Sequence, residues 1–340
     1  MRIAEVNDVA WVATEFTAGL REIGHESELL RPRLVGATLP PWLKPVVAPV
    51  RFIDWLRLAW RLRNGHYDAI HIHYAYLGVV GILARLPYVL HCHGDDVRDL
   101  QRPLRRPVIR RAIERARYVF YSTPDLAPLV TAIRADAEFL PNPVDTALFA
   151  PHEVEPRGAD ILIACSLSAN KGVANILEFV RIFATERPAA RITAIAHGEA
   201  ADSFAAFPNV TLISHQVRQK LPALISQHRV VVGQAHKGAI GMVELEAMSC
   251  GRPLVASFEH NTAYAEPPPV VNARSGQEIA AAVIALLDDP ERAEEIGARS
   301  REWILRHHDR RVVAARLADV LASGRSPVAA AAGGARSGRA

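Results

Sequence analysis

Short apolar runs alternate with amphipathic stretches along most of the chain. The first half holds six runs rich in β-branched and other apolar residues, at residues 2–6, 26–30, 67–73, 87–93, 117–122 and 137–141. The second half repeats the rhythm at residues 160–166, 191–197, 209–215, 229–234, 252–257 and 268–271. Strands that alternate with helices predict parallel sheets covered on both faces. The pattern therefore predicts an α/β chain with two doubly wound domains.

A proline-rich segment at residues 140–160 separates the two series of strands. We expect an N-terminal domain at residues 1–152 and a second domain at 153–305, because linkers between domains are rich in proline and polar residues. A helix at 306–324 is expected to return to the N-terminal domain. The tail at 325–340 is poor in large apolar residues and is expected to be disordered.

Composition and cysteine usage favour a globular protein of a reducing compartment. Half of the 340 residues are apolar, which is enough for two cores of ordinary size. Cys92, Cys165 and Cys250 lie far apart, without the spacing of a disulfide framework or a cysteine metal site. The N-terminus lacks the features of a signal peptide, and no apolar run approaches about 18 residues. We therefore expect a cytoplasmic protein.

The formal net charge of +4 is unevenly spread, with arginine concentrated at residues 102–117. This stretch is typical of a solvated helix face or of a surface that meets anionic groups. No nucleic-acid-binding pattern accompanies it, so we expect no nucleic-acid partner. In residues 40–63, Ile53, Leu56 and Trp60 line one helical stripe that we expect to be core. The exposed remainder and the arginines would suit peripheral contact with the cytoplasmic face of an anionic membrane.

One helix is predicted to hold two buried carboxylates. It begins near Gly241 and ends at Gly251, and it carries Glu244 and Glu246 among apolar residues on nearly every side. Residues two apart cannot share a helix face, so the two glutamates need different partners. Each is expected to be satisfied, since a buried carboxylate without a partner is costly.

Polar residues also gather where the predicted strands end. In open α/β sheets the ligand lies beyond the carboxyl ends of the strands, where helix N-termini favour negative charge. The strand exits are residues 7–8, 71–74, 91–96, 166–172 and 234–241. Two facing domains would bring these segments to one cleft, and a phosphate-bearing ligand would suit it.

Six segments, in this order, resemble the retaining glycosyltransferases of the GT-B fold, family four (the group 1 enzymes). They are LREIGHESEL, YDAIHIHYAYLGVVGILA, PYVLHCHGDDV, FLPNPVDTALFAP, SANKGVANILEFV and ELEAMSCGRPLVAS. The resemblance implies two Rossmann-like domains that face a central cleft. It also implies transfer of a sugar from a nucleoside diphosphate sugar to an acceptor hydroxyl, with retention of configuration. No metal and no further cofactor are expected.

The same resemblance assigns roles to individual residues. Glu246 would hold the ribose hydroxyls of the donor, Lys171 would meet its diphosphate, and His93 would lie beside its sugar. The other donor-binding residues would be Ser166, Gly172, Gly238, Gly241, Met242 and Val243. The acceptor side would hold Asn7, Asp8, His73, Tyr74 and Asp96. The acceptor itself is a glycan, a lipid-linked molecule or a small molecule.

The chain differs from the family pattern in three features. Ser166 stands where the family has an arginine five residues before Lys171, and Gly238 stands where it has the first glutamate of a Glu-x7-Glu pair. The glycine pair that follows the first strand in the family is missing. Lys237 or one of the arginines would have to compensate for the lost groups.

Two other interpretations remain open. His71, His73, His91 and His93 lie two apart on neighbouring strands and could form the metal site of a hydrolase. Alternatively, the missing arginine and glutamate could mark a glycosyltransferase-like fold that only binds its ligand.

Overall fold

The structure is a computed structural model that describes residues 1–33, 35, 39–152 and 160–323. The expected tail and residues 153–159 of the expected linker lie outside the described residues. The chain forms two compact units, each described here by itself. Unit 1 holds Met1–Pro143 and the segment that begins at Arg310, and unit 2 holds Val144–Asp309.

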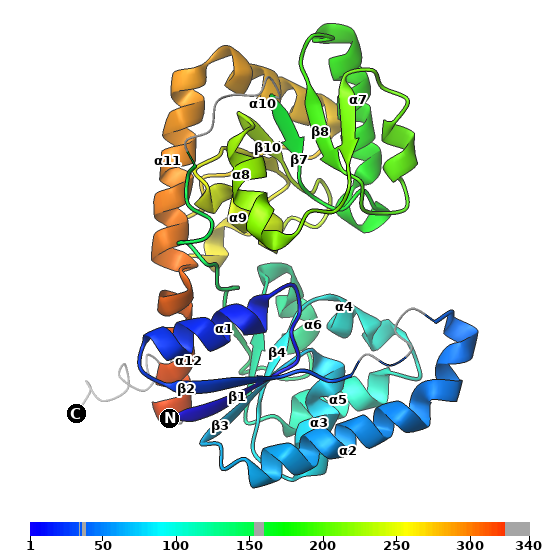
Figure 1. Cartoon of the computed structure of the whole chain (residues 1–340), viewed down its shortest axis with the longest axis vertical. Helices are drawn as coiled ribbons and strands as arrows, with labels where there is room; N and C mark the ends of the chain where they lie inside the picture. Colours follow the sequence, from blue (N-terminus) through cyan, green and yellow to red (C-terminus); the bar gives the residue numbers. More distant parts are fainter. Residues whose placement is uncertain (34, 36–38, 153–159, 324–340) are drawn as a thin grey trace, which may run out of the picture. The chain divides into compact units, whose positions relative to one another are not determined.

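Unit 1 is built on a parallel sheet with the strand order β2-β1-β3-β4-β5-β6 (Figure 1). Its strands are β1 (Arg2–Val6), β2 (Glu26–Leu30), β3 (Ala69–His73), β4 (Val89–Cys92), β5 (Tyr118–Tyr121) and β6 (Glu138–Phe139). Its α-helices are α1 (Val12–Glu22), α2 (Ala48–Asn64), α3 (Gly78–Ala84), α4 (Asp95–Arg98), α5 (Arg106–Arg115), α6 (Ala127–Thr131) and α12 (Arg310–Ser323). Its short 3-10 helices are η1 (Pro41–Val47), η2 (Ala75–Leu77), η3 (Asp99–Gln101) and η4 (Pro124–Leu126).

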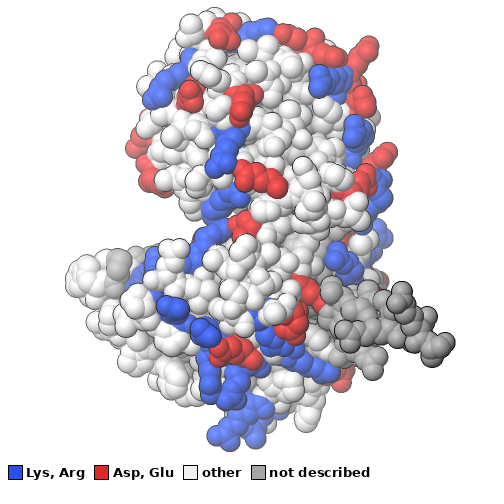
Figure 2. All heavy atoms as spheres, turned by 180° about the vertical axis from the view of Figure 1, so that it is seen from behind, with Lys and Arg blue, Asp and Glu red and all other residues white. Residues whose placement is uncertain are grey.

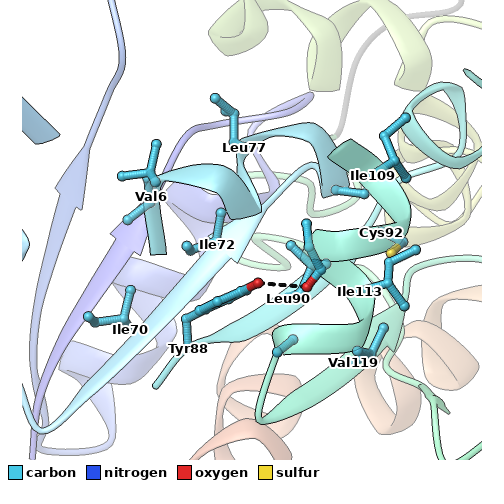
Figure 3. Packing of buried hydrophobic residues seen from close by; sticks show 14 of the residues in the cluster. Val6, Ile70, Ile72, Leu77, Tyr88, Leu90, Cys92, Ile109, Ile113 and Val119 are labelled. Atoms are coloured by element: carbon cyan, nitrogen blue, oxygen red, sulfur yellow. Dashed lines mark hydrogen bonds between the residues drawn. The ribbon is translucent and has the colours of Figure 1, made fainter. Parts of the chain in front are cut away.

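One face of this sheet is apolar and packs against α2, α3 and α5. Ile72 and Leu90 of the central strands meet Ile113 of α5, and all three side chains are fully buried. Figure 3 shows this packing, together with the 2.6 Å hydrogen bond that the Tyr88 hydroxyl donates to the Ala112 carbonyl. Each fully buried aliphatic side chain of this size contributes about 1.5 to 3 kcal/mol.

The opposite face of the sheet carries a row of buried polar side chains. Glu5 pairs in register with His71, and His73 with His91, so all four project from the same face. Phe16 of α1 covers them, with its ring centroid 5.2 Å from that of His71 and 5.7 Å from those of His73 and His91. The four polar side chains are fully buried.

Helix α12 lies beside α1 in unit 1 (Figure 1). The close approach requires glycine at position 19, because a Cβ there would lie 2.4 Å from the carbonyl oxygen of Arg310. The Arg310 guanidinium pairs with Glu15 at 3.1 Å and also with Glu22. Packing and charge together fix α12 on this unit.

Unit 2 has a second parallel sheet, with the order β12-β11-β10-β7-β8-β9. Its strands are β7 (Ile161–Ile163), β8 (Ile192–Ile195), β9 (Val210–Ile213), β10 (Val230–Val232), β11 (Leu254–Ala256) and β12 (Val271–Asn272). Its α-helices are α7 (Val173–Glu186), α8 (Leu221–Ser226), α9 (Met242–Ser249), α10 (Gly276–Asp288) and α11 (Pro290–His307). Its 3-10 helices are η5 (Ala169–Lys171), η6 (Ala201–Phe204), η7 (Arg218–Lys220) and η8 (Asn261–Ala263).

The strand pattern of the sequence is confirmed, since each of the expected runs coincides or overlaps with one strand of the two sheets. Unit 2, however, includes residues 144–152 and 306–309, which the sequence assigned to the N-terminal domain and to the returning helix. The reason is local hydrogen bonding. The Val144 amide donates to the His308 carbonyl at 2.7 Å, and the Thr146 hydroxyl donates to the Asp309 carboxylate.

The expectation that Ile53, Leu56 and Trp60 form a core stripe is wrong. These side chains are 50%, 44% and 70% exposed. Helix α2 instead buries the stripe that contains Leu58 and Leu62, which lie one turn apart and face the sheet. Helical spacing is compatible with either stripe, and the packing of the sheet selects one of them.

Basic side chains gather over part of unit 1 on the face drawn in Figure 2, with a few acidic ones among them. Among the described helices, none has a stretch long and apolar enough to cross a membrane.

Candidate functional site

Glu244 shapes the loop that leads into α9. Its carboxylate accepts a hydrogen bond from the Gly241 amide and a second, at 2.6 Å, from the Gln234 amide. The side chain is 1% exposed, so these backbone donors provide the partners that a buried carboxylate needs. Glu244 therefore caps α9 and closes the loop between residues 234 and 241.

Glu246 has a different partner on another side of the same helix. One of its carboxylate oxygens lies 3.4 Å from both Nε and Nη2 of Arg218. The guanidinium of Arg218 also lies over the ring of Phe149, 5.1 Å from its centroid. The sequence required a partner for Glu246, but it could not identify Arg218, because the two residues are 28 positions apart and the fold alone brings them together.

Lys171 reaches the N-terminus of α9. Its Nζ lies 3.7 Å from the position that a Cβ on Gly241 would occupy. Gly172 makes this approach possible, because it has φ +78° and a Cβ there would lie 2.8 Å from the backbone of Ala235. An ammonium group beside a helix N-terminus places two sources of positive potential at one point, which suits a phosphate group.

Gly238 lies in the left-handed region with φ +65°, where a side chain is strained. A Cβ at this position would come within 3.1 to 3.2 Å of the side-chain carbons of Glu259. The Glu259 amide donates to the Gly238 carbonyl at 3.0 Å, and its carboxylate pairs with Arg274 at 2.6 Å. A carboxylate from another segment therefore lies next to the position of the family's first glutamate.

The remaining expected donor-binding residues lie in the same unit. Met242 and Val243 form the first turn of α9, and both are partly buried. Ser166 follows β7, and its hydroxyl donates to the His197 carbonyl at 3.3 Å. This hydroxyl carries no charge, unlike the arginine that the family has at this position.

In unit 1, His93 belongs to a chain of three hydrogen-bonded side chains. His73 Nδ1 lies 3.0 Å from His93 Nε2, and His73 Nε2 lies 2.7 Å from Glu5 Oε2. Burial raises the pKa of Glu5 and lowers that of His73 well below its usual range. Burial and the nearby His71 lower the pKa of His93 to about 3. The imidazoles are therefore neutral at pH 7, and the order of donors and acceptors along the chain is set by Glu5.

Asp96 fixes the loop that carries His93. It is fully buried and accepts hydrogen bonds from the amides of Ala75 (2.6 Å), His93 (3.0 Å) and Val97 (2.9 Å). Burial raises its pKa to about 6, and these amide donors oppose the shift. The contacts of Asp96 position the loop, and direct contact with a ligand stays a prediction.

His71, His73 and His91 form a group that could hold a metal ion, since their ring nitrogens lie within 4.8 Å of one another. His93 is not one of its members. The group lies fully buried beneath Phe16, where a hydrolytic substrate and its attacking water have no access. The geometry therefore does not favour the hydrolase interpretation.

A pocket of about 530 Å³ lies at the carboxyl ends of β1 and β3 in unit 1. Three of the five residues expected on the acceptor side, Asn7, Asp8 and Tyr74, line it. The other two, His73 and Asp96, are buried within the same unit. The basic and aromatic residues that complete the pocket were not among those expected on the acceptor side, because they come from η1, α2 and loops distant in sequence.

Two family models match the chain. One, described as a glycosyl transferase 4-like domain, matches residues 8–143. The other, described as glycosyl transferase-like, matches residues 179–319. Together they span most of both units.

Curated relatives and solved structures that resemble this chain support the match to the two glycosyltransferase family models. The D-inositol 3-phosphate glycosyltransferase of Pseudarthrobacter chlorophenolicus is 27% identical over 296 residues, which cover 72% of this chain and 69% of that protein. Sucrose-phosphate synthase from Thermosynechococcus elongatus has a similar structure, with a TM-score of 0.74 at 16% identity over 95% of this chain and 99% of that one. Anabaena HepE in complex with UDP-glucose has a TM-score of 0.71 at 14% identity over 95% and 100% of the two chains.

Proposed function

This chain belongs to the group 1 glycosyltransferases of the GT-B fold, and on this basis we propose that it transfers a sugar from a nucleoside diphosphate sugar to an acceptor hydroxyl with retention of configuration. The observation that carries the proposal is the ammonium group of Lys171 at the N-terminus of α9. The diphosphate of the donor would lie against this ammonium group and the first amides of the helix. The HepE structures with UDP and UDP-glucose support uridine as the first base to test.

Glu246 is the proposed anchor for the donor ribose. A carboxylate can accept hydrogen bonds from two adjacent hydroxyls, and such charge-assisted bonds are stronger than neutral ones. Arg218 lies at 3.4 Å from this carboxylate and is its cationic partner. Glu244 has no part in donor binding, because its two oxygens already accept backbone amides.

The proposed reaction uses no nucleophile from the enzyme and no divalent metal. The acceptor hydroxyl attacks the sugar on the face that the diphosphate leaves, and a phosphate oxygen of the donor takes the acceptor proton. Lys171 and the α9 amides stabilise the negative charge that grows on the leaving diphosphate. His93 orients the sugar and is itself held by His73 and Glu5.

We also propose peripheral contact between unit 1 and the cytoplasmic face of an anionic membrane. Trp42 and Trp60 are 74% and 70% exposed, and Leu104, between arginine-rich segments, is 90% exposed. Exposed aromatic and aliphatic side chains beside basic residues favour the interface of an anionic bilayer. The arginines that accompany them lie on α5 and on the loop between η3 and α5.

A thermal-shift screen with nucleoside diphosphates and nucleotide sugars tests the donor assignment, because a ligand that binds the folded state raises the melting temperature. We expect UDP and UDP-sugars to stabilise the protein equally with and without EDTA. The anomeric configuration of the transferred sugar, read by NMR, tests retention. Absence of stabilisation by every nucleotide would contradict the proposed function, and binding without turnover over a broad acceptor panel would favour the binding-protein interpretation.

A further inference from the structure

The pocket of about 530 Å³ in unit 1 has a distinctive charge. Four cationic side chains line it, those of Arg33, Lys44, Arg51 and Arg105, against one carboxylate, that of Asp8. These cations come from four separate places in the sequence, namely the loop after β2, η1, α2 and the residue before α5. The fold therefore concentrates positive charge on a small volume.

The single carboxylate of the pocket does not balance these cations. Asp8 accepts hydrogen bonds from the Thr14 hydroxyl at 2.6 Å and from Arg31 at 2.7 Å. Arg31 pairs with Asp8 and offsets its negative charge, but Arg31 is not one of the four cations that line the pocket. The Arg51 side chain is held by a 2.8 Å hydrogen bond from its Nε to the Val35 carbonyl. The pocket keeps a net positive charge, and part of it is fixed in place.

Aromatic rings form another part of the wall. Trp55 and Tyr76 pack edge to face with centroids 5.3 Å apart, and the guanidinium of Arg105 lies 5.7 Å from the centroid of Tyr76. Such a wall offers a rigid apolar surface beside the cations. Binding pockets for small molecules combine these two elements, and their volumes are commonly about 300 to 1,000 Å³.

The backbone at the pocket is strained. Asn7, Ala10 and Tyr74 all line the pocket and have positive φ angles, of 70°, 49° and 88°. Non-glycine residues rarely adopt such angles, and they concentrate at functional sites. The Asn7 side chain donates to the His73 carbonyl at 3.2 Å, which links the pocket wall to the chain of hydrogen bonds at His93.

We propose that this pocket binds the acceptor through a phosphate group, so that the acceptor is a phosphate ester of a polyol or sugar. The cations hold the phosphate, and the rings of Trp55 and Tyr76 flank the carbon skeleton. The inference rests on the proposed function, since it concerns the second substrate of the same reaction. The phosphate ester is either a free metabolite or a lipid headgroup.

The test measures binding of glucose 6-phosphate, glycerol 3-phosphate and inositol 1-phosphate by isothermal titration calorimetry, with glucose, glycerol and inositol as neutral partners. Saturating UDP is present throughout, so that the probes cannot occupy the donor site. We expect at least one phosphate ester to bind and its neutral partner not to bind. Substitution of Lys44→Gln together with Arg33→Gln should weaken that binding about tenfold or more.

Arg57→Gln is the matched control, because Arg57 is an exposed residue of α2 that does not line the pocket. It should leave the affinity for the phosphate ester unchanged, and all variants should bind UDP as the wild type does. Equal affinity for the phosphate esters and their neutral partners, or no effect of the double substitution, would overturn the inference. If UDP still binds in that case, only the inference about the acceptor is wrong and the proposed function stands. If UDP does not bind, the proposed function itself is wrong.

A second arm separates the two sources of the phosphate. Flotation compares two kinds of phosphatidylcholine vesicle that have the same surface charge. One kind contains phosphatidic acid, whose headgroup is a phosphate monoester, and the other contains phosphatidylglycerol. Binding of the soluble esters without vesicles indicates a free acceptor. Preference for phosphatidic acid that is lost in the Lys44→Gln/Arg33→Gln variant indicates a lipid headgroup.

Discussion

His73 Nδ1 lies 3.0 Å from His93 Nε2, and this contact ties the expected sugar-binding histidine to a side chain that is fully buried. The other nitrogen of His73 is held at 2.7 Å by Glu5. With Glu5 Oε2 as the acceptor, His73 Nε2 donates a hydrogen bond to it, which leaves His73 Nδ1 to accept a hydrogen bond from His93 Nε2. His93 then presents Nδ1 as an acceptor, and a donor hydroxyl of the sugar can bind there.

Glu5→Gln should therefore lower turnover about tenfold or more, the scale of a charged hydrogen bond, while UDP affinity stays the same. The amide can donate to His73 Nε2 and would reverse the order of donors along the chain. Glu28→Gln, on the neighbouring strand β2, is the control and should leave turnover unchanged. Unchanged turnover in Glu5→Gln would show that the chain has no part in positioning His93.

Acid should destabilise unit 1 through its buried histidines. The folded-state pKa values of His73, His91 and His93 are depressed, so below pH 6.5 the unfolded chain binds protons that the folded chain does not. Stability that is present above pH 6.5 is then lost as the pH falls. The raised pKa values of Glu5 and Asp96 act in the opposite direction, since the folded state keeps their protons at higher pH.

The three imidazoles outnumber the two carboxyl groups, so the free energy of unfolding should be lower at pH 5 than at pH 7. Urea unfolding at both pH values measures the difference. In Asp96→Asn, which lacks one opposing carboxyl group, the loss between pH 6 and pH 4 should be steeper. A free energy of unfolding that rises as the pH falls from 7 to 5 would contradict the assignment of neutral buried histidines.

The two glutamates of α9 should differ in what their loss changes. Glu246→Gln should weaken donor binding by about 1.5 to 3 kcal/mol, the scale of a charged hydrogen bond. Glu244→Gln should mainly lower stability. The side-chain NH2 group of the glutamine cannot accept a hydrogen bond, so one of the two backbone amides that donate to Glu244 would lose its acceptor. Calorimetric titration with UDP and thermal unfolding of both variants separate the effects. Equal losses of donor affinity would refute the assignment of Glu246.

Gly238 predicts a permissive donor-sugar pocket. The family's first glutamate is absent here, and a site without a dedicated carboxylate discriminates weakly against sugars that lack one hydroxyl. We expect modest discrimination between UDP-glucose and its deoxygenated analogues. Rejection of a deoxy donor by about 10⁴ or more would show that another residue has replaced the glutamate.

Glu259 is the residue to test in that case, because its side chain lies against Gly238. Glu259→Gln should then relax the discrimination, whereas Glu278→Gln, at the start of α10, should not. The neighbouring Lys237 amide donates to the Gln234 side chain at 2.6 Å, which helps to hold this loop.

The membrane contact predicts salt-sensitive binding to anionic vesicles. Trp42→Ser together with Trp60→Ser removes two side chains that are 74% and 70% exposed, so the fold should persist while flotation is lost. Trp11→Ser, at a residue that is 47% exposed, serves as the control outside this surface. Absence of vesicle binding by the wild type at low salt would reject the contact.

Much of the fold could be predicted because the apolar runs mark where the strands lie along the chain, and their alternation with helices indicates parallel sheets. The start of α9 after Gly241 and its end near Gly251 could be predicted in the same way, from glycine and apolar patterning. The exposure of the stripe that contains Trp60 could not be predicted. Two stripes of α2 have helical spacing, and only packing against the sheet determines which of them is buried.

One short motif predicted that Lys171 and Gly172 lie near the start of α9, and their roles in donor binding stay predictions. Side-chain partners from distant segments could not be predicted. Arg218 pairs with Glu246 across 28 positions, and Glu5 reaches His73 across 68. Such pairs depend on strand register and on loop packing, which local sequence does not encode.

The central claim is that Lys171 and α9 bind the diphosphate of a nucleotide sugar, and calorimetric comparison of UDP with UMP tests it most directly. The second phosphate distinguishes the two ligands, so their affinity ratio isolates the diphosphate contact. We expect UDP to bind more tightly than UMP, and Lys171→Gln to remove most of that advantage while Lys220→Gln, at an exposed lysine of the same unit, keeps it. Equal affinities of the wild type for UDP and UMP, or an advantage that survives in Lys171→Gln, would contradict the account.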